Sequence, residues 1–297
     1  MIWAKVAVAA LAWLTAAPLP QPRSELGAAV FRGEIVVVGG LTAEGVASAR
    51  ADAFSPAAGS WRRLPDLPVA VHHALVAADD RRLYVAGGYG GRLGAGDRLR
   101  TVFAFDGTRW RALPRMPEPR AAGGAAVLGG RLYVVGGVGA VRLAQRAFAL
   151  DLRTNRWSVA PSPTPREHLA VTSAGGRIYA VGGRKAGYDT NVATFESWTP
   201  GAKRWRQLPD VPRPRGGTGA AVAAGRLVSV GGEEPAGTIA TVYAWDLGRG
   251  GWRRLPDLRT PRHGLGVVAV GARVYAIGGG RTPGLAVSGA DEYLDLK

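Results

Sequence analysis

The chain has 297 residues, no cysteine and a formal net charge of +16 at pH 7. The absence of cysteine excludes disulfide bonds, thiolate catalysis and metal sites with cysteine ligands. A basic surface attracts anions, but the arginines are spread over the whole chain, without a recognition helix or an aromatic RNA-binding pattern. We therefore do not expect nucleic-acid binding, and we interpret most of the charge as a solvated surface.

The first residues have the character of a leader. Lys5 is followed by an apolar stretch over 6–14 and by small residues at 15–17, which is typical of a secretory signal. We predict that residues 1–12 are an apolar leader or signal-like segment, cleaved or uncleaved. The protein would then be exported to the periplasm or the extracellular space; a cytoplasmic location is the alternative. No other stretch approaches the roughly 18 apolar residues of a membrane-spanning helix.

From residue 13 onwards the chain is a sixfold repeat. Gly-Gly doublets recur every 46 to 49 residues, and a fixed period of this size indicates one structural unit in several copies. The doublets are Gly39-Gly40, Gly87-Gly88, Gly136-Gly137, Gly182-Gly183, Gly231-Gly232 and Gly278-Gly279.

Each repeat predicts four strands. Two apolar runs separated by a polar or glycine turn, such as 124–128 and 132–135, predict a β-hairpin that ends at the doublet. A third run follows, and a fourth begins at a tryptophan and stops at a proline four residues later. Six such units predict an all-β, six-bladed β-propeller of four antiparallel strands per blade, with small residues where the inner strands crowd. The tryptophans are Trp61, Trp110, Trp157, Trp205 and Trp252.

The last repeat ends at Lys297, before any tryptophan strand. Trp13 lies 48 residues before Trp61 and ten before Arg23, which is the spacing of Trp110 to Arg120. We therefore predict that residues 13–18 form the outer strand of the sixth blade. Residues 13–297 would then be a single propeller, closed by its N-terminal strand without a covalent bond.

The repeat resembles the Kelch family. The resemblance rests on the apolar run that closes on Gly-Gly, on aromatic or aliphatic residues followed by aspartate (Phe105-Asp106, Trp245-Asp246), and on the tryptophan five to seven residues later. It implies that peptides or sugars bind on the face of the loops after the doublets. The copper chemistry of the galactose-oxidase branch needs a cysteine-crosslinked tyrosine, which this chain lacks. Bacterial N-acetylneuraminate epimerases are six-bladed relatives that act on a carboxylated sugar.

Sixteen residues before the doublets, five of the six repeats carry an arginine. These residues begin the innermost strands, so we expect them near the mouth of the central channel, where guanidinium groups would select anions. The alternative is structural, with each arginine binding backbone carbonyls of the next blade. The five are Arg23, Arg120, Arg166, Arg215 and Arg262.

All four histidines stand beside these arginine positions. His72 and His263 occupy the next position of their repeats, and His73 and His168 the one after. Tyr89 and Arg184 begin two of the variable loops after the doublets, and such loops commonly carry recognition. The predicted ligand-binding set is the five arginines together with His72, His168, His263, Tyr89 and Arg184.

These patterns favour a non-enzymatic binding module that recognises a protein or an anionic ligand, either an acidic peptide or an acidic glycan. No nucleophile elbow, phosphate-binding loop or zinc-helix motif is present, so we expect no cofactor and no metal. Two alternatives stay open. One is a carbohydrate-active isomerase or mutarotase of the sialic-acid epimerase type, with Glu167, His168 and His263 near its acid–base chemistry. The other is a structural assembly module.

Overall fold

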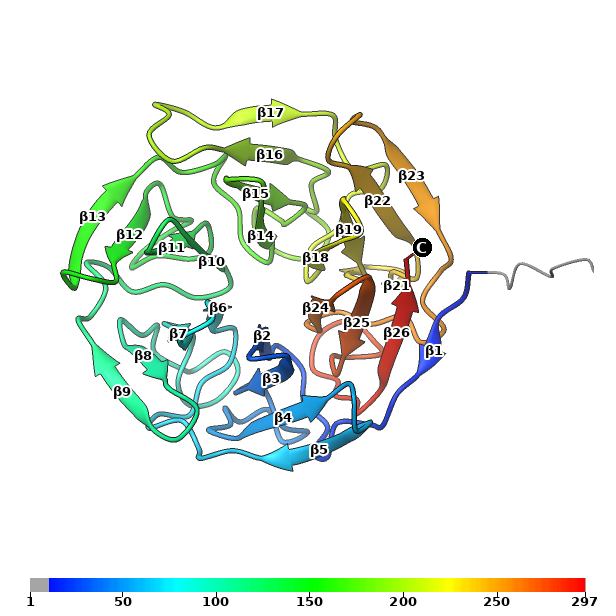
Figure 1. Cartoon of the computed structure of the whole chain (residues 1–297), viewed down its shortest axis with the longest axis horizontal. Coiled ribbons are helices and arrows are strands. Elements are labelled where there is room, and N and C mark those ends of the chain that lie inside the picture. The colour runs from blue at the N-terminus through cyan, green and yellow to red at the C-terminus, as the bar shows by residue number, and fades with distance from the viewer. Residues whose placement is uncertain (1–10, 297) are drawn as a thin grey trace, which may run out of the picture.

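The computed structural model describes residues 11–296. Six four-stranded antiparallel sheets surround a central axis and form a disc (Figure 1). The predicted all-β, six-bladed propeller is confirmed. Most of the predicted leader falls on residues 1–10, outside the described residues, and stays a prediction. Within 11–296 no helix is long and apolar enough to cross a membrane.

Each blade is an antiparallel meander whose first strand lies nearest the axis (Figure 1). The first three blades are β2 (Gly27–Phe31), β3 (Glu34–Val38), β4 (Ala51–Ser55), β5 (Ser60–Arg63); β6 (Leu75–Ala78), β7 (Leu83–Ala86), β8 (Val102–Phe105), β9 (Trp110–Leu113); and β10 (Gly124–Leu128), β11 (Arg131–Val135), β12 (Ala147–Asp151), β13 (Arg156–Ala160). The last three are β14 (Ala170–Ala174), β15 (Arg177–Val181), β16 (Phe195–Trp198), β17 (Arg206–Leu208); β18 (Gly219–Ala223), β19 (Arg226–Val230), β22 (Val242–Asp246), β23 (Trp252–Leu255); and β24 (Gly266–Val270), β25 (Arg273–Ile277), β26 (Asp291–Asp295), β1 (Leu14–Thr15). A short hairpin of β20 (Glu233–Glu234) and β21 (Gly237–Thr238) follows the fifth doublet.

The doublets join neighbouring blades. Gly39 and Gly40 have φ values of 62° and 104°, which glycine adopts without steric cost. The second glycine donates its N–H to the next blade, from Gly40 to the carbonyl of Val71 and from Gly279 to that of Arg23, at 2.8 Å each. A Cβ on Gly40 would come within 2.7 Å of the Ser24 carbonyl oxygen. Backbone conformation and close approach therefore explain why the doublet recurs.

The hydrophobic core fills the spaces between adjacent blades. One cluster combines Val228 and Val230 of the fifth blade with Val274 and Ala276 of the sixth. Around the axis, a Cβ added to Gly27 or Gly219 would collide with a valine of the next blade. The predicted small residues at the crowded inner strands are thus present at these places.

The tryptophans form a second joint at the perimeter. The indole N–H of Trp110 donates to the carbonyl of Pro65, the proline that ends the preceding outer strand, at 2.8 Å. At the seam, β1 pairs with β26 (Figure 1). Trp13 is 2% exposed, and its indole donates to Pro256 at 2.9 Å. The predicted closure of the ring by an N-terminal outer strand is confirmed.

Candidate functional site

The five repeated arginines lie inside the blades. Their side chains are at most 1% exposed. Arg23 donates to the carbonyls of Gly39 and Arg50 at 3.0 and 2.8 Å, both in its own blade. The expectation that these arginines face the channel mouth is therefore wrong, and the carbonyls they bind do not belong to the next blade. Burial favours the structural alternative.

The partner of each arginine comes from the third strand of the same blade. Three arginines pair with carboxylates: Arg23 with Asp52 at 2.6 Å, Arg166 with Glu196 at 2.5 Å and Arg262 with Glu292 at 3.1 Å. The other two lie over aromatic rings, with Arg120 5.2 Å from the centre of Phe148 and Arg215 5.2 Å from that of Tyr243. The second blade has Val71 in place of the arginine, whereas Phe103 keeps an aromatic ring at the partner position. In the other five blades the arginine and its partner form one structural unit.

Two residues after the arginine position, each blade contributes one residue to a ring around the channel, which we call the hub ring. All six residues are left-handed, with φ between 50° and 67°. Five backbone N–H groups donate to the carbonyl of the preceding member, at 2.7 to 3.0 Å. The members are Glu25, His73, Ala122, His168, Gly217 and Gly264, and all line the channel.

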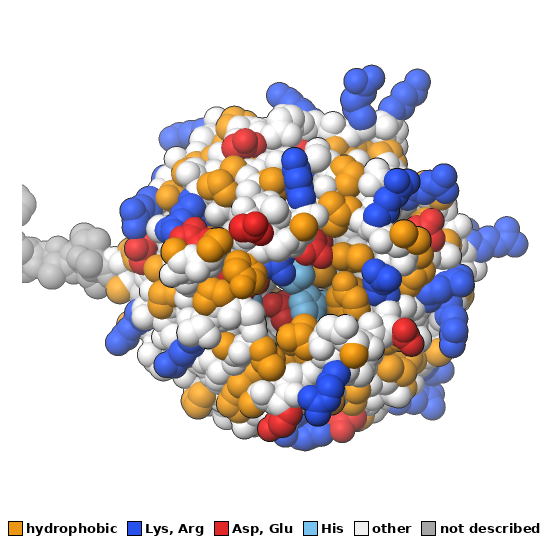
Figure 2. Space-filling model, turned by 180° about the vertical axis from the view of Figure 1, so that it is seen from behind, with side chains coloured by type: hydrophobic (Ala, Val, Ile, Leu, Met, Phe, Trp, Pro, Cys, Tyr) orange, Lys and Arg blue, Asp and Glu red, His pale blue; other side chains and the backbone are white. Residues whose placement is uncertain are grey.

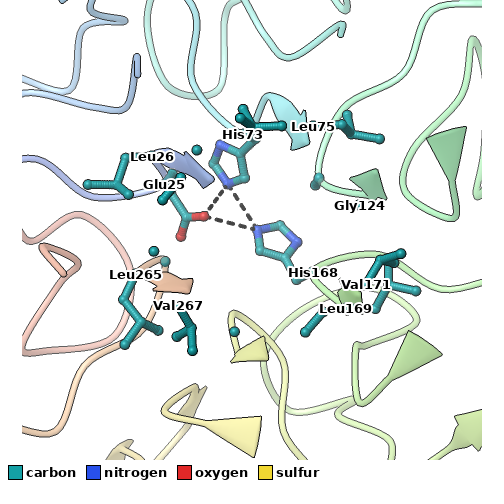
Figure 3. Close-up of a pocket in the computed structure, with 18 of the residues that line it drawn as sticks. Glu25, Leu26, His73, Leu75, Gly124, His168, Leu169, Val171, Leu265 and Val267 are labelled. Atoms are coloured by element: carbon teal, nitrogen blue, oxygen red, sulfur yellow. Dashed lines mark hydrogen bonds and ion pairs between the residues drawn. The ribbon is translucent and has the colours of Figure 1, made fainter. Parts of the chain in front are cut away.

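Glu25, His73 and His168 converge in the mouth of the channel (Figure 3). The cavity there has a volume of about 140 Å³. His73 Nε2 lies 2.9 Å from His168 Nε2 and 3.1 Å from Glu25 Oε2, and His168 Nε2 lies 3.9 Å from the same oxygen. Burial by itself raises the pKa of Glu25, but the neighbouring imidazoles of His73, His263 and His168 outweigh burial and hold that pKa well below its ordinary value.

His72 and Tyr89 support this group from one side. The ring of Tyr89 stacks on His72 with centroids 5.3 Å apart, and His72 Nδ1 lies 2.5 Å from His73 Nδ1. Burial lowers the pKa of His72 to about 4 and that of His73 well below its usual value, despite the attraction of Glu25. Both imidazoles are therefore neutral at neutral pH.

His263 is different, because both of its ring nitrogens face acceptors. Its Nδ1 lies 3.2 Å from Glu25 Oε1, and its Nε2 lies 3.0 Å from the carbonyl oxygen of Thr282. Both bonds form only when the imidazole carries two protons. Burial lowers the pKa of His263, but the hydrogen bond to Glu25 and the charges of Glu25 and Glu233 outweigh burial and raise it. We assign His263 as an imidazolium.

Arg184 completes the mouth. Its guanidinium donates to Glu233 Oε1 at 2.6 Å and to Glu167 Oε1 at 3.2 Å, and Nη2 lies 3.0 Å from His168 Nε2. Burial raises the pKa of Glu167, but His168 and Arg184 outweigh burial and lower it. Three carboxylates of the mouth thus face one guanidinium and one imidazolium. The mouth therefore does not carry the excess of positive charge that the sequence predicted.

The structure brings together half of the predicted site: His72, His168, His263, Tyr89 and Arg184. The ligand-binding set omitted Glu25, His73 and Glu233. The repeat itself carries the missing signal. Glu25 occupies the same repeat position as His73 and His168, fourteen residues before a doublet, and Glu233 directly follows its doublet as Tyr89 and Arg184 do.

Apolar side chains surround the charged mouth. Figure 2 shows the histidines at the bottom of a hollow, with hydrophobic side chains around it. Four large hydrophobic residues in the loops after the doublets are between 41% and 88% exposed. We call them the apolar rim: Leu93, Val141, Tyr188 and Leu285.

The fold and the repeat have known counterparts. Residues 72–280 match the family model of the KLHDC2/KLHL20/DRC7 Kelch-repeats domain, and residues 22–68 match the Kelch motif. The solved structure titled "Structure of YjhT" superposes with a TM-score of 0.80 at 18% identity, over 92% of this chain and 95% of that one. At this identity the likeness shows the fold alone.

Two curated relatives match over a short segment. Kelch-like protein 36 of Mus musculus is 43% identical over 60 residues, which are 20% of this chain and 10% of that protein. The F-box/kelch-repeat protein At1g16250 of Arabidopsis thaliana is 37% identical over 57 residues, 19% of this chain and 15% of that protein. The match thus spans a small part of both relatives. The family model, by contrast, matches most of the chain, which therefore belongs to the Kelch-repeat β-propeller family.

Proposed function

We propose that this protein is a non-enzymatic recognition module that binds a segment of a partner protein across the mouth of the channel. The Kelch propeller fold supports a binding or scaffold role. The observation that carries the proposal is the apolar rim around a charged mouth. Exposed apolar side chains that lie close together mark interaction surfaces. Leu93 and Leu285 both lie within 4 Å of the Cβ position of Gly45. Two further loops after the doublets expose Val141 and Tyr188.

Two of the loops that present the rim, those of Leu93 and Leu285, are bonded to a loop of a neighbouring blade. The Leu93 N–H donates to the carbonyl of Gly45 at 2.9 Å, and the Arg92 guanidinium donates to that of Glu44, also at 2.9 Å. On the other side, the Thr238 hydroxyl donates to the Arg281 carbonyl at 3.0 Å. Loops of neighbouring blades are therefore bonded, and a preorganised surface loses less entropy on binding.

The sign of the ligand's charge is a separate question. The predicted acidic peptide or acidic glycan rested mainly on five arginines, and these are enclosed in the blades. The cations that reach the mouth, Arg184 and His263, already pair with Glu167, Glu233 and Glu25. An acidic ligand therefore requires further positive charge at the mouth, whereas an apolar segment requires only the rim.

A random peptide library displayed on phage tests the proposal. The library is selected on the wild type, and the enriched peptides are measured on Leu93→Asp/Leu285→Asp. The control is Val159→Asp, which places one aspartate on an exposed residue of the outer strand β13, and the single variants Leu93→Asp and Leu285→Asp match it in charge. We expect at least tenfold weaker binding to the double variant and unchanged binding to the control. Equal binding to the wild type, the double variant and the control would remove the rim from the site.

The two alternatives have their own readouts. An isomerase would speed the interconversion of the anomers of N-acetylneuraminic acid in an NMR time course and would lose this activity in His168→Gln, which would overturn the non-enzymatic proposal. An assembly module would use the rim to bind a second copy. Sedimentation would then show a dimer that dissociates in Leu93→Asp/Leu285→Asp.

A further inference from the structure

We propose that Glu25, His73 and His168 bind a divalent first-row transition metal ion in the mouth of the channel. The three residues come from the first, second and fourth blades and share the hub-ring position. Their ligand atoms point toward one another (Figure 3) and lie within 4.8 Å of each other. The inference does not rest on the proposed function, because the donor atoms alone carry it. It replaces the expectation that the protein binds no metal.

The spacing of the three atoms fits a tetrahedral ion. Ligand atoms about 2.0–2.2 Å from zinc stand roughly 3.3 Å apart in a tetrahedral site. The observed separations of 2.9, 3.1 and 3.9 Å bracket this value. Two imidazole nitrogens and one carboxylate suit zinc, iron, nickel and copper, and three protein ligands leave one position open toward the channel.

The backbone conformation at the hub-ring positions favours glycine over residues with a side chain. All hub-ring residues are left-handed, a conformation that glycine adopts freely and other residues adopt at a steric cost. Glycine stands at two of the six positions, Gly217 and Gly264. Glutamate and two histidines at three of the others are therefore unfavourable for the fold, which points to a use for their donor atoms.

Polar groups face the second nitrogen of both histidine ligands. His73 Nδ1 lies 2.5 Å from His72 Nδ1, and His168 Nδ1 faces Glu167 Oε1 at 3.4 Å without a hydrogen bond. Metal-binding histidines typically donate a hydrogen bond from their second nitrogen, and His72 is placed to accept it from His73. When His73 carries its proton on Nδ1 and donates it to His72, its Nε2 is left as a neutral metal ligand.

The second oxygen of Glu25 faces a similar group, His263 and Glu233. There, however, donors already satisfy the carboxylates. His263 Nδ1 lies 3.2 Å from Glu25, and Glu233 accepts from Arg184 at 2.6 Å and from the Gly284 N–H at 2.9 Å. The inference is therefore confined to the His73 side of Glu25.

Arg184 is the competitor for this site, since its Nη2 lies 3.0 Å from His168 Nε2. Its other nitrogens are held by Glu167 and Glu233, so the guanidinium keeps two partners when it releases the imidazole. Removing this guanidinium frees a ligand atom and takes away a repelling charge. Arg184→Gln should consequently bind the ion more tightly, a result that general damage to the mouth would not produce.

The test uses the full chain, treated with EDTA and then dialysed. Zn²⁺ binding is followed by calorimetry, and Co²⁺ binding by the visible absorption of a tetrahedral ion. We expect one ion per chain, at least tenfold weaker binding in Glu25→Gln, His73→Gly and His168→Gly, and several-fold tighter binding in Arg184→Gln. The two glycine variants keep a backbone that the fifth and sixth blades already use at this position, so they should fold.

Asp66→Asn, which changes an exposed carboxylate on the perimeter, is the control and should bind like the wild type. Three results would overturn the inference: no Zn²⁺ binding by the wild type at micromolar concentrations, undiminished binding in His168→Gly, or weaker binding in Arg184→Gln. Thermal unfolding in EDTA identifies any histidine variant that has lost its fold. If a histidine variant is unfolded, the inference is tested with Glu25→Gln, whose Co²⁺ absorption should be weaker than that of the wild type at the same Co²⁺ concentration.

Discussion

The repeated arginines and the hub ring lie two residues apart on the same segment of each blade, yet their surroundings have little in common. The arginines are enclosed, and each has a partner within its own blade. The hub-ring residues line a channel to which all six blades contribute. The first set is nearly uniform, whereas the second holds glutamate, histidine, alanine and glycine.

This difference follows from how often each environment occurs. The interior of a blade occurs six times, and five of the six blades satisfy backbone carbonyls with an arginine at the same repeat position, so one solution recurs. The channel occurs once, and each blade supplies one side chain to it, so six different residues can build one site. In a repeat protein, identity among the copies therefore indicates structure, and variation at a converging position indicates function.

The largest expected effect tests whether the repeated arginines stabilise the fold. Arg166→Ala removes the cation that pairs with the buried Glu196 carboxylate, which keeps Thr164 as a donor. It also removes the guanidinium donor of the Gly182 carbonyl. Breaking a buried pair costs about 3–5 kcal/mol, so the midpoint of urea unfolding should fall sharply. Arg177→Ala, at the exposed start of β15, should change the free energy of unfolding by less than about 0.5 kcal/mol.

The paired variant Arg166→Leu/Glu196→Leu sharpens this result. With both charges removed, no uncompensated charge stays buried, so part of the lost stability should return, although the Gly182 carbonyl still lacks its guanidinium donor. If Arg166→Ala unfolds like the wild type, the repeated arginines are not structural, and their assignment to a ligand regains its support.

A smaller effect concerns a buried carboxyl group that has no hydrogen-bond partner. Asp291 is 1% exposed, and neither of its carboxylate oxygens has a hydrogen-bond partner. Burial raises its pKa to about 8, against the pull of Arg262. Because the folded state favours the neutral acid, its contribution to stability is complete below pH 4 and is lost as the pH rises toward 8.

Asp291→Asn removes this loss. We expect the variant to be more stable than the wild type by roughly 1–3 kcal/mol at pH 9 and nearly equal to it at pH 4. Unfolding curves across this range measure the difference. A constant gap between the two proteins at all pH values would contradict the assignment.

The smallest expected effect tests the strain in the hub ring. Ala122 has a φ of 53°, so Ala122→Gly should stabilise the fold by about 0.5–1 kcal/mol. The melting temperature should rise by about 1–3 °C. The reverse change, Gly217→Ala, should lower it, since the new Cβ would also lie 3.2 Å from the Cβ of His263. Shifts of the opposite sign would show that the ring is unstrained.

Most of the fold could be predicted from the sequence, and half of the site. The doublets and tryptophans recur because each makes the same joint between blades, so their spacing counted the blades and placed Trp13 at the seam. The arginines were misplaced because the repeat gives their position along the chain but does not tell whether their side chains point into the blade or into the channel. Glu25 was missed because only alignment with His73 and His168 shows that it faces the same channel.

The sequence by itself determined what is local and repeated: six units, four strands in each, and a glycine doublet at the end of each hairpin. Only the tertiary structure decided which side chains meet. Glu25 and His263 are 238 residues apart along the chain, and they come together because the ring closes between the sixth blade and the first. Because the hub-ring residues are left-handed, the alternation of side chains along a strand does not extend to them. Packing around the axis therefore decided that the arginine side chains point into the blades and the hub-ring side chains into the channel.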